Sequence, residues 1–187
     1  MPSHSILRDL CESVYHTCDD EIAGIEYTIV GNVVCFRGTD EWSDWTTNVR
    51  FLPVYRRKLG WCPAGFLKVS QKVSIKILCE IAKAKMPISE LVLTGHSLGG
   101  AVAMLMGAHL TKSGVPPKEI VTFGAPKCGR LKLLDDVDVT QYRNGVDIVP
   151  KTPPLMRRHK APIRGGISEG RIKDHSIVNY KDCIKEE

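Results

Sequence analysis

The chain has 187 residues, with 43% hydrophobic and 25% charged side chains. This length and composition are typical of one globular domain with its own core, so we expect residues 1–187 to form a single domain. No apolar run reaches the length of a membrane span, which excludes a membrane helix. The N-terminal stretch contains Arg8, Asp9 and Glu12 and no small-residue cleavage site, so we expect no signal peptide and a cytoplasmic or other intracellular location.

The net charge is +5, and the excess of Lys and Arg is concentrated in Arg50–Lys58 and Arg157–Arg171. Basic stretches attract nucleic acid, anionic membranes or acidic substrates, or they form solvated surface. The chain has no zinc-finger pattern and no RNA-binding pattern of interleaved aromatic residues, so no nucleic-acid partner is expected. A transient contact with a lipid or anionic membrane surface stays open.

Seven cysteines are scattered along the chain, and no two of them form a C-x-x-C pair. An odd, dispersed set argues against a zinc site or a thioredoxin-like site. We expect mostly free, partly buried thiols in a reducing compartment. The seven are Cys11, Cys18, Cys35, Cys62, Cys79, Cys128 and Cys183.

The first third of the chain predicts a helix, two strands and a loop. Apolar residues at helical spacing predict an amphipathic helix over Ser5–Cys18. Two strands are expected at Ile25–Val30 and Val33–Phe36, joined by a short hairpin turn. Val54–Ala64 is basic and loop-like. The helix positions expected to face the core are Ile6, Leu10 and Val14.

The central region alternates between helices and short apolar strands. Gly65–Lys85 carries a continuous apolar stripe and predicts a long helix. Strands are expected at Leu91–Leu93, Ile120–Phe123 and Val137–Tyr142, with a helix of small residues after the first of them. This alternation predicts an α/β domain with a mainly parallel central sheet flanked by helices.

The last part of the chain is less regular. Leu131–Leu134 predicts one turn of helix, and Pro150–Gly170 is expected to be irregular because it is rich in proline and glycine. A final helix is expected to start near Asp174-His175 and to run to the end of the chain.

The strand at Leu91–Leu93 leads into a G-x-S-x-G motif at residues 95–99, and a helix follows at once. A serine at the apex of a sharp strand–turn–helix needs glycines on both sides, because the strand and helix approach closely there. The positive end of the following helix then points at whatever the serine attacks. Ser97 is therefore a candidate nucleophile, although a bare glycine-rich turn without chemistry is the alternative.

A serine nucleophile needs a histidine to accept its proton and a carboxylate to orient that histidine. In the α/β-hydrolase order the acid and then the histidine follow the serine. Among the histidines after Ser97, we favour His175, in an apolar-flanked segment; His109 lies along the helix away from the motif, and His159 stands in a basic run expected at the surface. Asp147 is the favoured acid because it follows the carboxyl end of a strand, the edge where α/β sheets bind ligands.

Other carboxylates remain as candidates for the acid, and Asp147 could instead cap the backbone of its own turn. The developing oxyanion needs at least two placed donors. The backbone N–H of Leu98 is one, and Thr39, after an early strand, is expected to supply the second. The other candidate acids are Asp135, Asp136 and Asp138.

The motifs together resemble the class 3 lipases, the fungal-lipase-like family of α/β-hydrolases. The matching stretches are VVCFRGT at 33–39, WTTNV at 45–49, TGHSLGGA at 94–101, VTFGAPKCG at 121–129, NGVDIVPKTPP at 144–154 and DHSIVNY at 174–180. The resemblance implies the α/β-hydrolase fold, with Ser97 as nucleophile, Asp147 as acid, His175 as base, and Thr39 and Leu98 in the oxyanion hole. Two departures are a chain shorter than many family members and the absence of a histidine just before Gly65-Phe66.

The resemblance also places a possible lid at residues 42–61, where aromatic residues could meet lipid and Arg50, Arg56, Arg57 and Lys58 could meet anionic head groups. A loop packed on the sheet is the alternative. We predict a serine carboxylester hydrolase that cleaves acylglycerol-type lipid esters and needs no metal or organic cofactor. A phospholipase or short-chain esterase, and a lipid-binding protein without activity, are the alternatives.

Overall fold

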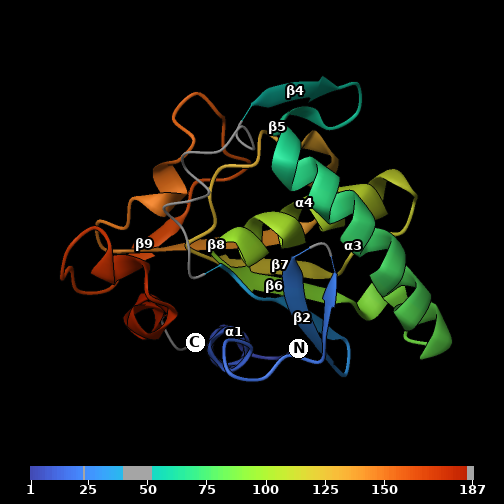
Figure 1. Ribbon diagram of the computed structural model, residues 1–187, viewed down its shortest axis with the longest axis horizontal. Helices are drawn as coiled ribbons and strands as arrows, with labels where there is room; N and C mark the ends of the chain where they lie inside the picture. Colours follow the sequence, from blue (N-terminus) through green and yellow to red (C-terminus); the bar gives the residue numbers. More distant parts are fainter. Residues whose placement is uncertain (23, 40–51, 185–187) are drawn as a thin grey trace.

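The computed structural model describes residues 1–22, 24–39 and 52–184. Its centre is a seven-stranded sheet with the order β1-β2-β3-β6-β7-β8-β9, and a separate two-stranded sheet pairs β4 with β5 (Figure 1). The strands are β1 (Asp20–Ile22), β2 (Ile25–Val30), β3 (Val33–Phe36), β4 (Pro53–Arg56), β5 (Gly60–Pro63), β6 (Val92–His96), β7 (Glu119–Phe123), β8 (Asp138–Asn144) and β9 (Ile163–Gly165).

The sheet is parallel from β3 to β9 and antiparallel only where β1, β2 and β3 pair. Val34 lies opposite Leu93, and Leu93 lies opposite Ile120. β6 and β7 are buried along their whole lengths, as expected for parallel strands with both faces covered. The predicted α/β-hydrolase-type fold, with a mainly parallel sheet between helices, is confirmed.

Helices cover the sheet on both faces. α3 (Ala64–Lys83) and α4 (Leu98–Lys112) lie on one face, and α1 (His4–Ser13) and the 3-10 segment η6 (Ile177–Cys183) lie on the other (Figure 1). The buried apolar side chains accordingly form two clusters, one under α3 and α4 and one under α1 and η6. The N-terminal helix and the C-terminal segment therefore pack together beneath the strands that end at the motif of residues 95–99.

Two expectations for the outer segments are wrong in detail. α1 ends at Ser13 rather than at Cys18, because the Ser13 hydroxyl binds the Leu10 carbonyl and so competes with the backbone. Its buried face is formed by Leu7, Cys11 and Val14, whereas Ile6 is exposed. The apolar spacing therefore predicted the helix and the inward position of Val14, with Leu10 partly buried against the core, but it was wrong about Ile6.

The segment expected to be a loop at Val54–Ala64 is a β-hairpin. Tyr55 pairs with Trp61 and Val54 with Cys62, and Cys62 is buried against the core. Only one of the two faces of the hairpin contacts the core, and each strand has only four residues. The alternation of buried and exposed side chains is therefore too short to be distinguished from a loop in the sequence.

In place of the expected final α-helix, the chain up to residue 184 forms 3-10 turns at η5 (Lys173–His175) and η6, separated by an extended Ser176. This break turns the segment immediately after His175. Within the described residues, no helix is both long and apolar enough to cross a membrane. All seven cysteines are free, and the sulfurs of the buried Cys11 and Cys35 lie 3.6 Å apart.

The close approach of α4 to the sheet predicts a difference between two glycines of that helix. A Cβ at Gly99 would overlap the carbonyl oxygen of Phe36, which is backbone and cannot rotate away. A Cβ at Gly107 would overlap the end of the Ile120 side chain and would otherwise make an ordinary contact with Pro117. We expect Gly99→Ala to lower the free energy of unfolding by about 2–4 kcal/mol in urea denaturation.

Gly107→Ala is the matched control, because the helix propensity of alanine, about 1 kcal/mol better than that of glycine, offsets the shift of Ile120. Equal losses from both substitutions would contradict the steric explanation.

Candidate active site

Ser97 stands at a strained elbow between β6 and α4. Its backbone has φ +54°, one of only two positive values among the described non-glycine residues. Such a conformation costs about 1–3 kcal/mol and persists where the surrounding structure fixes it. The flanking glycines provide that surrounding, since a Cβ at Gly95 would come within 2.5 Å of the Gly99 backbone. The Ser97 N–H also donates to the Phe123 carbonyl at 2.9 Å.

The structure brings the predicted serine, histidine and acid together. His175 Nε2 lies 2.9 Å from Ser97 Oγ, and His175 Nδ1 lies 2.8 Å from Asp147 Oδ2. A carboxylate oxygen can only accept, so Nδ1–H donates to Asp147, which leaves Nε2 of the neutral ring to accept the Ser97 hydroxyl proton. This is the arrangement in which a histidine acts as general base toward a serine.

Asp147 is fully buried and uses both carboxylate oxygens. Oδ1 accepts the Val149 N–H at 2.9 Å, so the local capping role considered for this residue is real, but Oδ2 remains for His175. Tyr180 donates its hydroxyl to the same Oδ2. Burial and the Asp147 charge raise the pKa of Tyr180 well above its ordinary value, which keeps this phenol a proton donor.

Tyr180 is a functional candidate that sequence reasoning missed. It lies in the quoted stretch of residues 174–180, five positions after His175, but no local pattern assigns a tyrosine to the acid. The tertiary fold places it there, because η6 folds back under β8 and buries the Tyr180 hydroxyl beside Asp147.

A second buried carboxylate joins the segment before His175 to the turn before Asp147. Asp174 accepts the N–H groups of Val146, Glu169 and Gly170 and the hydroxyl of Ser168. Burial alone would raise the pKa of Asp174, but these four donors outweigh it and lower the pKa. Asp174 therefore holds, as an anion, the two chain segments that carry the histidine and the acid.

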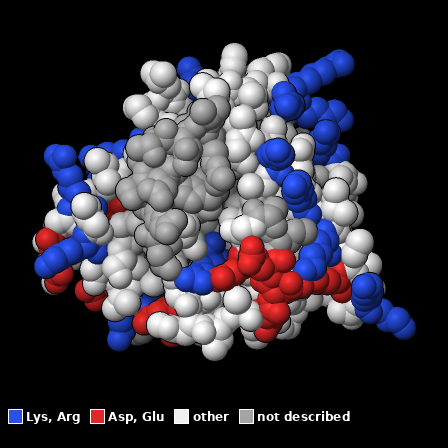
Figure 2. Space-filling model, viewed as in Figure 1, with Lys and Arg blue, Asp and Glu red and all other residues white. Residues whose placement is uncertain are grey.

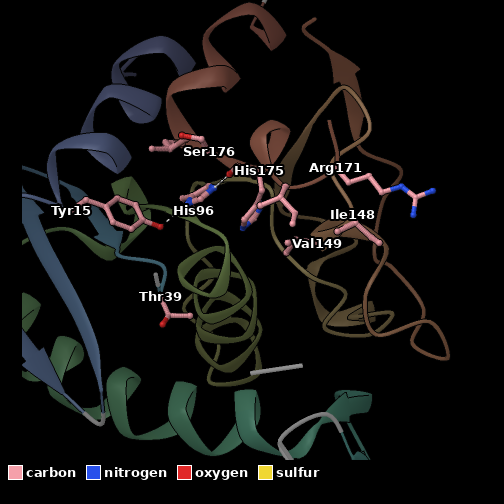
Figure 3. Close-up of a pocket in the computed structure, with 10 residues that line it drawn as sticks. Tyr15, Thr39, His96, Ile148, Val149, Arg171, His175 and Ser176 are labelled. Carbon is pink, nitrogen blue, oxygen red and sulfur yellow. Dashed lines mark hydrogen bonds between the residues drawn. The ribbon is translucent and has the colours of Figure 1, made fainter. Parts of the chain in front are cut away.

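His96 supports His175 from the other side (Figure 3). Its Nε2 lies 2.7 Å from the His175 carbonyl oxygen, and its Nδ1 lies 2.6 Å from the Tyr15 hydroxyl. Burial and the nearby His175 ring lower the pKa of His96 well below its ordinary value, so the ring stays neutral. Nε2–H then donates to the carbonyl, and Nδ1 accepts from Tyr15.

Of the two residues expected to bind an oxyanion, Leu98 lies at the elbow and Thr39 lies in the segment after β3 that packs against it. The Leu98 N–H is in the first turn of α4 and has no hydrogen-bond partner within the described part of the chain. Gly38, just before Thr39, packs so closely that a Cβ there would lie 2.9 Å from Ser97 Cβ. Thr39 is thereby held next to the serine.

A pocket of about 370 Å³ opens beside these groups. Figure 3 shows Thr39, His96 and His175 on one side and Ile148, Val149 and Arg171 on the other. Ser97 is buried and contributes no surface of its own to this pocket. Among the described residues, no group of three or more His, Cys, Asp or Glu side chains could hold a metal.

The rejected candidates lie elsewhere. His109 is half-buried and contacts Ser70 at 3.4 Å. His159 was expected at the surface, but it is buried: its Nδ1 accepts from Arg130 at 2.9 Å, and burial and that charge lower its pKa. Its position in a basic run was misleading because the run packs one face inward. The other candidate acids, Asp135, Asp136 and Asp138, are exposed.

The first half of the possible lid at residues 42–61 falls outside the described residues. Its second half, from Leu52 onward, is described, and that part forms the β4–β5 hairpin. The stretch WTTNV at 45–49 also lies outside the described part.

Comparison with known proteins identifies relatives of this chain. Residues 33–156 match the family model "Lipase (class 3)". The secreted mono- and diacylglycerol lipase 1 of Fusarium solani is 33% identical over 165 residues, covering 81% of this chain and 48% of the relative. Phospholipase A1-Igamma1 of Arabidopsis thaliana is 34% identical over 85 residues, covering 38% of this chain and 16% of the relative. The chain thus spans about half the length of the Fusarium relative.

Solved structures share the fold. The Rhizomucor miehei triacylglyceride lipase has a TM-score of 0.65 and 19% identity, covering 86% of this chain and 76% of that one. Lipase II from Rhizopus niveus has a TM-score of 0.64 and 21% identity, covering 81% and 72%. The family model ends at residue 156, before His175 and Tyr180, so their place in the site comes from the geometry.

We expect that loss of the Tyr180 hydroxyl slows turnover without changing how tightly the substrate binds. Tyr180→Phe removes one of the two donors to Asp147 Oδ2, so His175 is less firmly oriented. We expect kcat to fall about tenfold, equivalent to ~1.4 kcal/mol, with KM unchanged. Tyr142→Phe is the control, because the Tyr142 hydroxyl contacts His4 Nδ1 of α1 at 2.7 Å. A change in KM alone after Tyr180→Phe would contradict a positioning role.

Asp174→Asn predicts a pH-dependent loss of stability. The pKa of Asp174 is lowered from 3.8 in the folded protein, so its ionised form stabilises the fold above that value, and this contribution disappears as the pH falls through the lowered pKa. At neutral pH the side-chain NH2 group of the Asp174→Asn variant replaces one acceptor oxygen and faces a backbone N–H whose hydrogen bond Asp174 accepts in the wild type. This unpaired donor should lower the free energy of unfolding by about 1–3 kcal/mol.

We expect the difference between wild type and variant to shrink when urea unfolding is measured well below pH 3.8. The exposed Asp136→Asn should show no such pH dependence. A gap that stays constant with pH would show that the Asp174 charge is not what stabilises these segments.

Proposed function

The chain belongs to the class 3 lipase family, and from this we propose that it is a serine carboxylic ester hydrolase acting on acylglycerol-type lipid esters. The observation that carries the proposal is the hydrogen-bonded series Ser97–His175–Asp147 at the elbow, next to an apolar pocket. The Fusarium relative is by name a mono- and diacylglycerol lipase.

The proposed reaction begins when His175 Nε2 takes the Ser97 proton and Oγ attacks the ester carbonyl carbon. Asp147 stabilises the imidazolium that forms at His175. The negative oxygen of the tetrahedral intermediate accepts hydrogen bonds from the Leu98 N–H and from Thr39, at the positive end of α4. His175 then protonates the leaving alcohol as the carbon–oxygen bond breaks, leaving an acyl-Ser97.

The second half repeats the sequence with water. His175 removes a proton from a water molecule, whose oxygen attacks the acyl carbon, and the fatty acid leaves as Ser97 regains its proton. The same groups serve both halves, because the histidine ends each half in the protonation state that the next half needs.

The pocket rim supports a substrate with an apolar chain. Ile148, Val149 and Ile172 line it, and Ile172 is 86% exposed. An acyl chain bound in this pocket would cover Ile172 and remove its apolar side chain from water, which favours binding.

A phospholipase A1 activity is the second candidate, and Arg171 favours it. This exposed cation lines the same pocket and could bind a lipid phosphate. The Arabidopsis relative is by name a phospholipase A1.

A fluorophosphonate probe and an ester panel test the proposal. Wild-type protein should be labelled and should hydrolyse esters, whereas Ser97→Ala should lose labelling and at least about 10³-fold in kcat. Ser113→Ala, at the exposed end of α4, is the control. Equal labelling of wild type and Ser97→Ala would disprove the assignment. Diacylglycerol and phosphatidylcholine, compared in the same assay, separate the two candidate activities.

A further inference from the structure

A basic groove lies outside the candidate active site, between the β4–β5 hairpin and residues 155–157. Its volume is about 580 Å³. Among the described residues that line it there are five cations and no Asp or Glu. The cations are Arg57, Lys58, Arg130, Lys132 and Arg157.

Most of these charges are not neutralised. Arg130 pairs with Asp135 and contacts His159, but the other four cations form no ion pair within the described part of the chain. A second hollow on the other side of the hairpin turn contains Lys112 and again no described acid. Figure 2 shows Lys and Arg side chains gathered over the hairpin and α3, with Asp and Glu collected lower, over β1 and β2. The hairpin end is thus a strongly positive part of the surface.

Apolar groups stand among these cations. Tyr55 and Trp61 are cross-strand partners in edge-to-face contact at 5.6 Å, and they are 56% and 58% exposed. Leu155, on the opposite wall of the groove, is 94% exposed. Trp, Tyr and Leu flanked by Lys and Arg are the composition of surfaces that insert into the head-group region of a bilayer.

We propose that this groove docks the protein on a bilayer containing anionic phospholipids. Lys and Arg meet the lipid phosphates and carboxylates, and Trp61 and Leu155 enter the interface between them. A nucleic acid would use the cations but would leave Leu155 exposed to water. The proposal deepens the proposed function, since it supplies the surface on which a lipid ester is reached, but binding itself requires no hydrolysis.

Vesicle co-sedimentation with the inactive full chain Ser97→Ala tests the docking separately from catalysis. It should bind vesicles of equimolar phosphatidylserine and phosphatidylcholine at least about tenfold more tightly than vesicles of pure phosphatidylcholine. Adding Arg57→Gln and Lys58→Gln should weaken binding to the anionic vesicles about 25-fold, because each cation near such a surface contributes about fivefold. Trp61→Ala should weaken binding as well.

Lys83→Gln with Lys85→Gln, at the last residue of α3 and just beyond it, removes the same charge and should leave binding almost unchanged. Equal binding to both vesicle types, or equal losses from the two double variants, would overturn the proposal. So would tighter binding to duplex DNA than to vesicles, abolished by Arg57→Gln with Lys58→Gln, which would make the partner a nucleic acid. In parallel, hydrolysis of a soluble short-chain ester is measured for wild type and for the Arg57→Gln, Lys58→Gln protein with Ser97 intact, and the two rates should be equal. If wild type does not hydrolyse this ester, the catalytic proposal fails, whereas the vesicle result still decides the docking proposal.

Discussion

The approach of α4 to the end of β3 is the steric constraint on which the site depends. At Gly99 the helix passes so near the Phe36 carbonyl that no side chain fits between them. That proximity allows Ser97 to sit at a sharp turn with positive φ, puts the Leu98 N–H at an open helix end, and brings Gly38-Thr39 beside the serine. One backbone contact thus positions the nucleophile and both groups proposed to hold the oxyanion.

The remaining groups reach the serine through buried hydrogen bonds rather than through the sheet. Asp147 is fixed by its own turn and by Tyr180, and His175 is fixed by Asp147 and His96. Asp174 collects donors from both segments, so the histidine and the acid cannot move independently. Because these anions and rings are buried, each bond is strong, and a missing partner would leave a desolvated group unpaired.

The sequence carried the information for the parts of the chain with strong local patterns. The turn at Gly31-Asn32, the buried strands β6 and β7, and the glycines around Ser97 each dictate their structure through neighbouring residues. His175 and Asp147 were found because the chemistry of a serine nucleophile requires them in that order. Tyr180 and the role of Asp174 were not predictable, since their partners lie 33 and 28 positions away and only tertiary folding brings them together. His159 shows the opposite error, because charge in neighbouring residues says little about which way one side chain points.

The hydrogen-bonded chain from Tyr15 through His96 to the His175 carbonyl limits how this sequence can change over time. The residue between Gly95 and Ser97 is formally the variable position of the motif. Here it must offer a donor on one side and an acceptor on the other, within a buried site where a charge is unfavourable. A neutral imidazole meets both demands, and its acceptor nitrogen has a partner only while the turn after α1 presents the Tyr15 hydroxyl. Tyr15, in the turn after α1, and His96, 81 positions further along the chain, are therefore expected to be substituted together rather than independently.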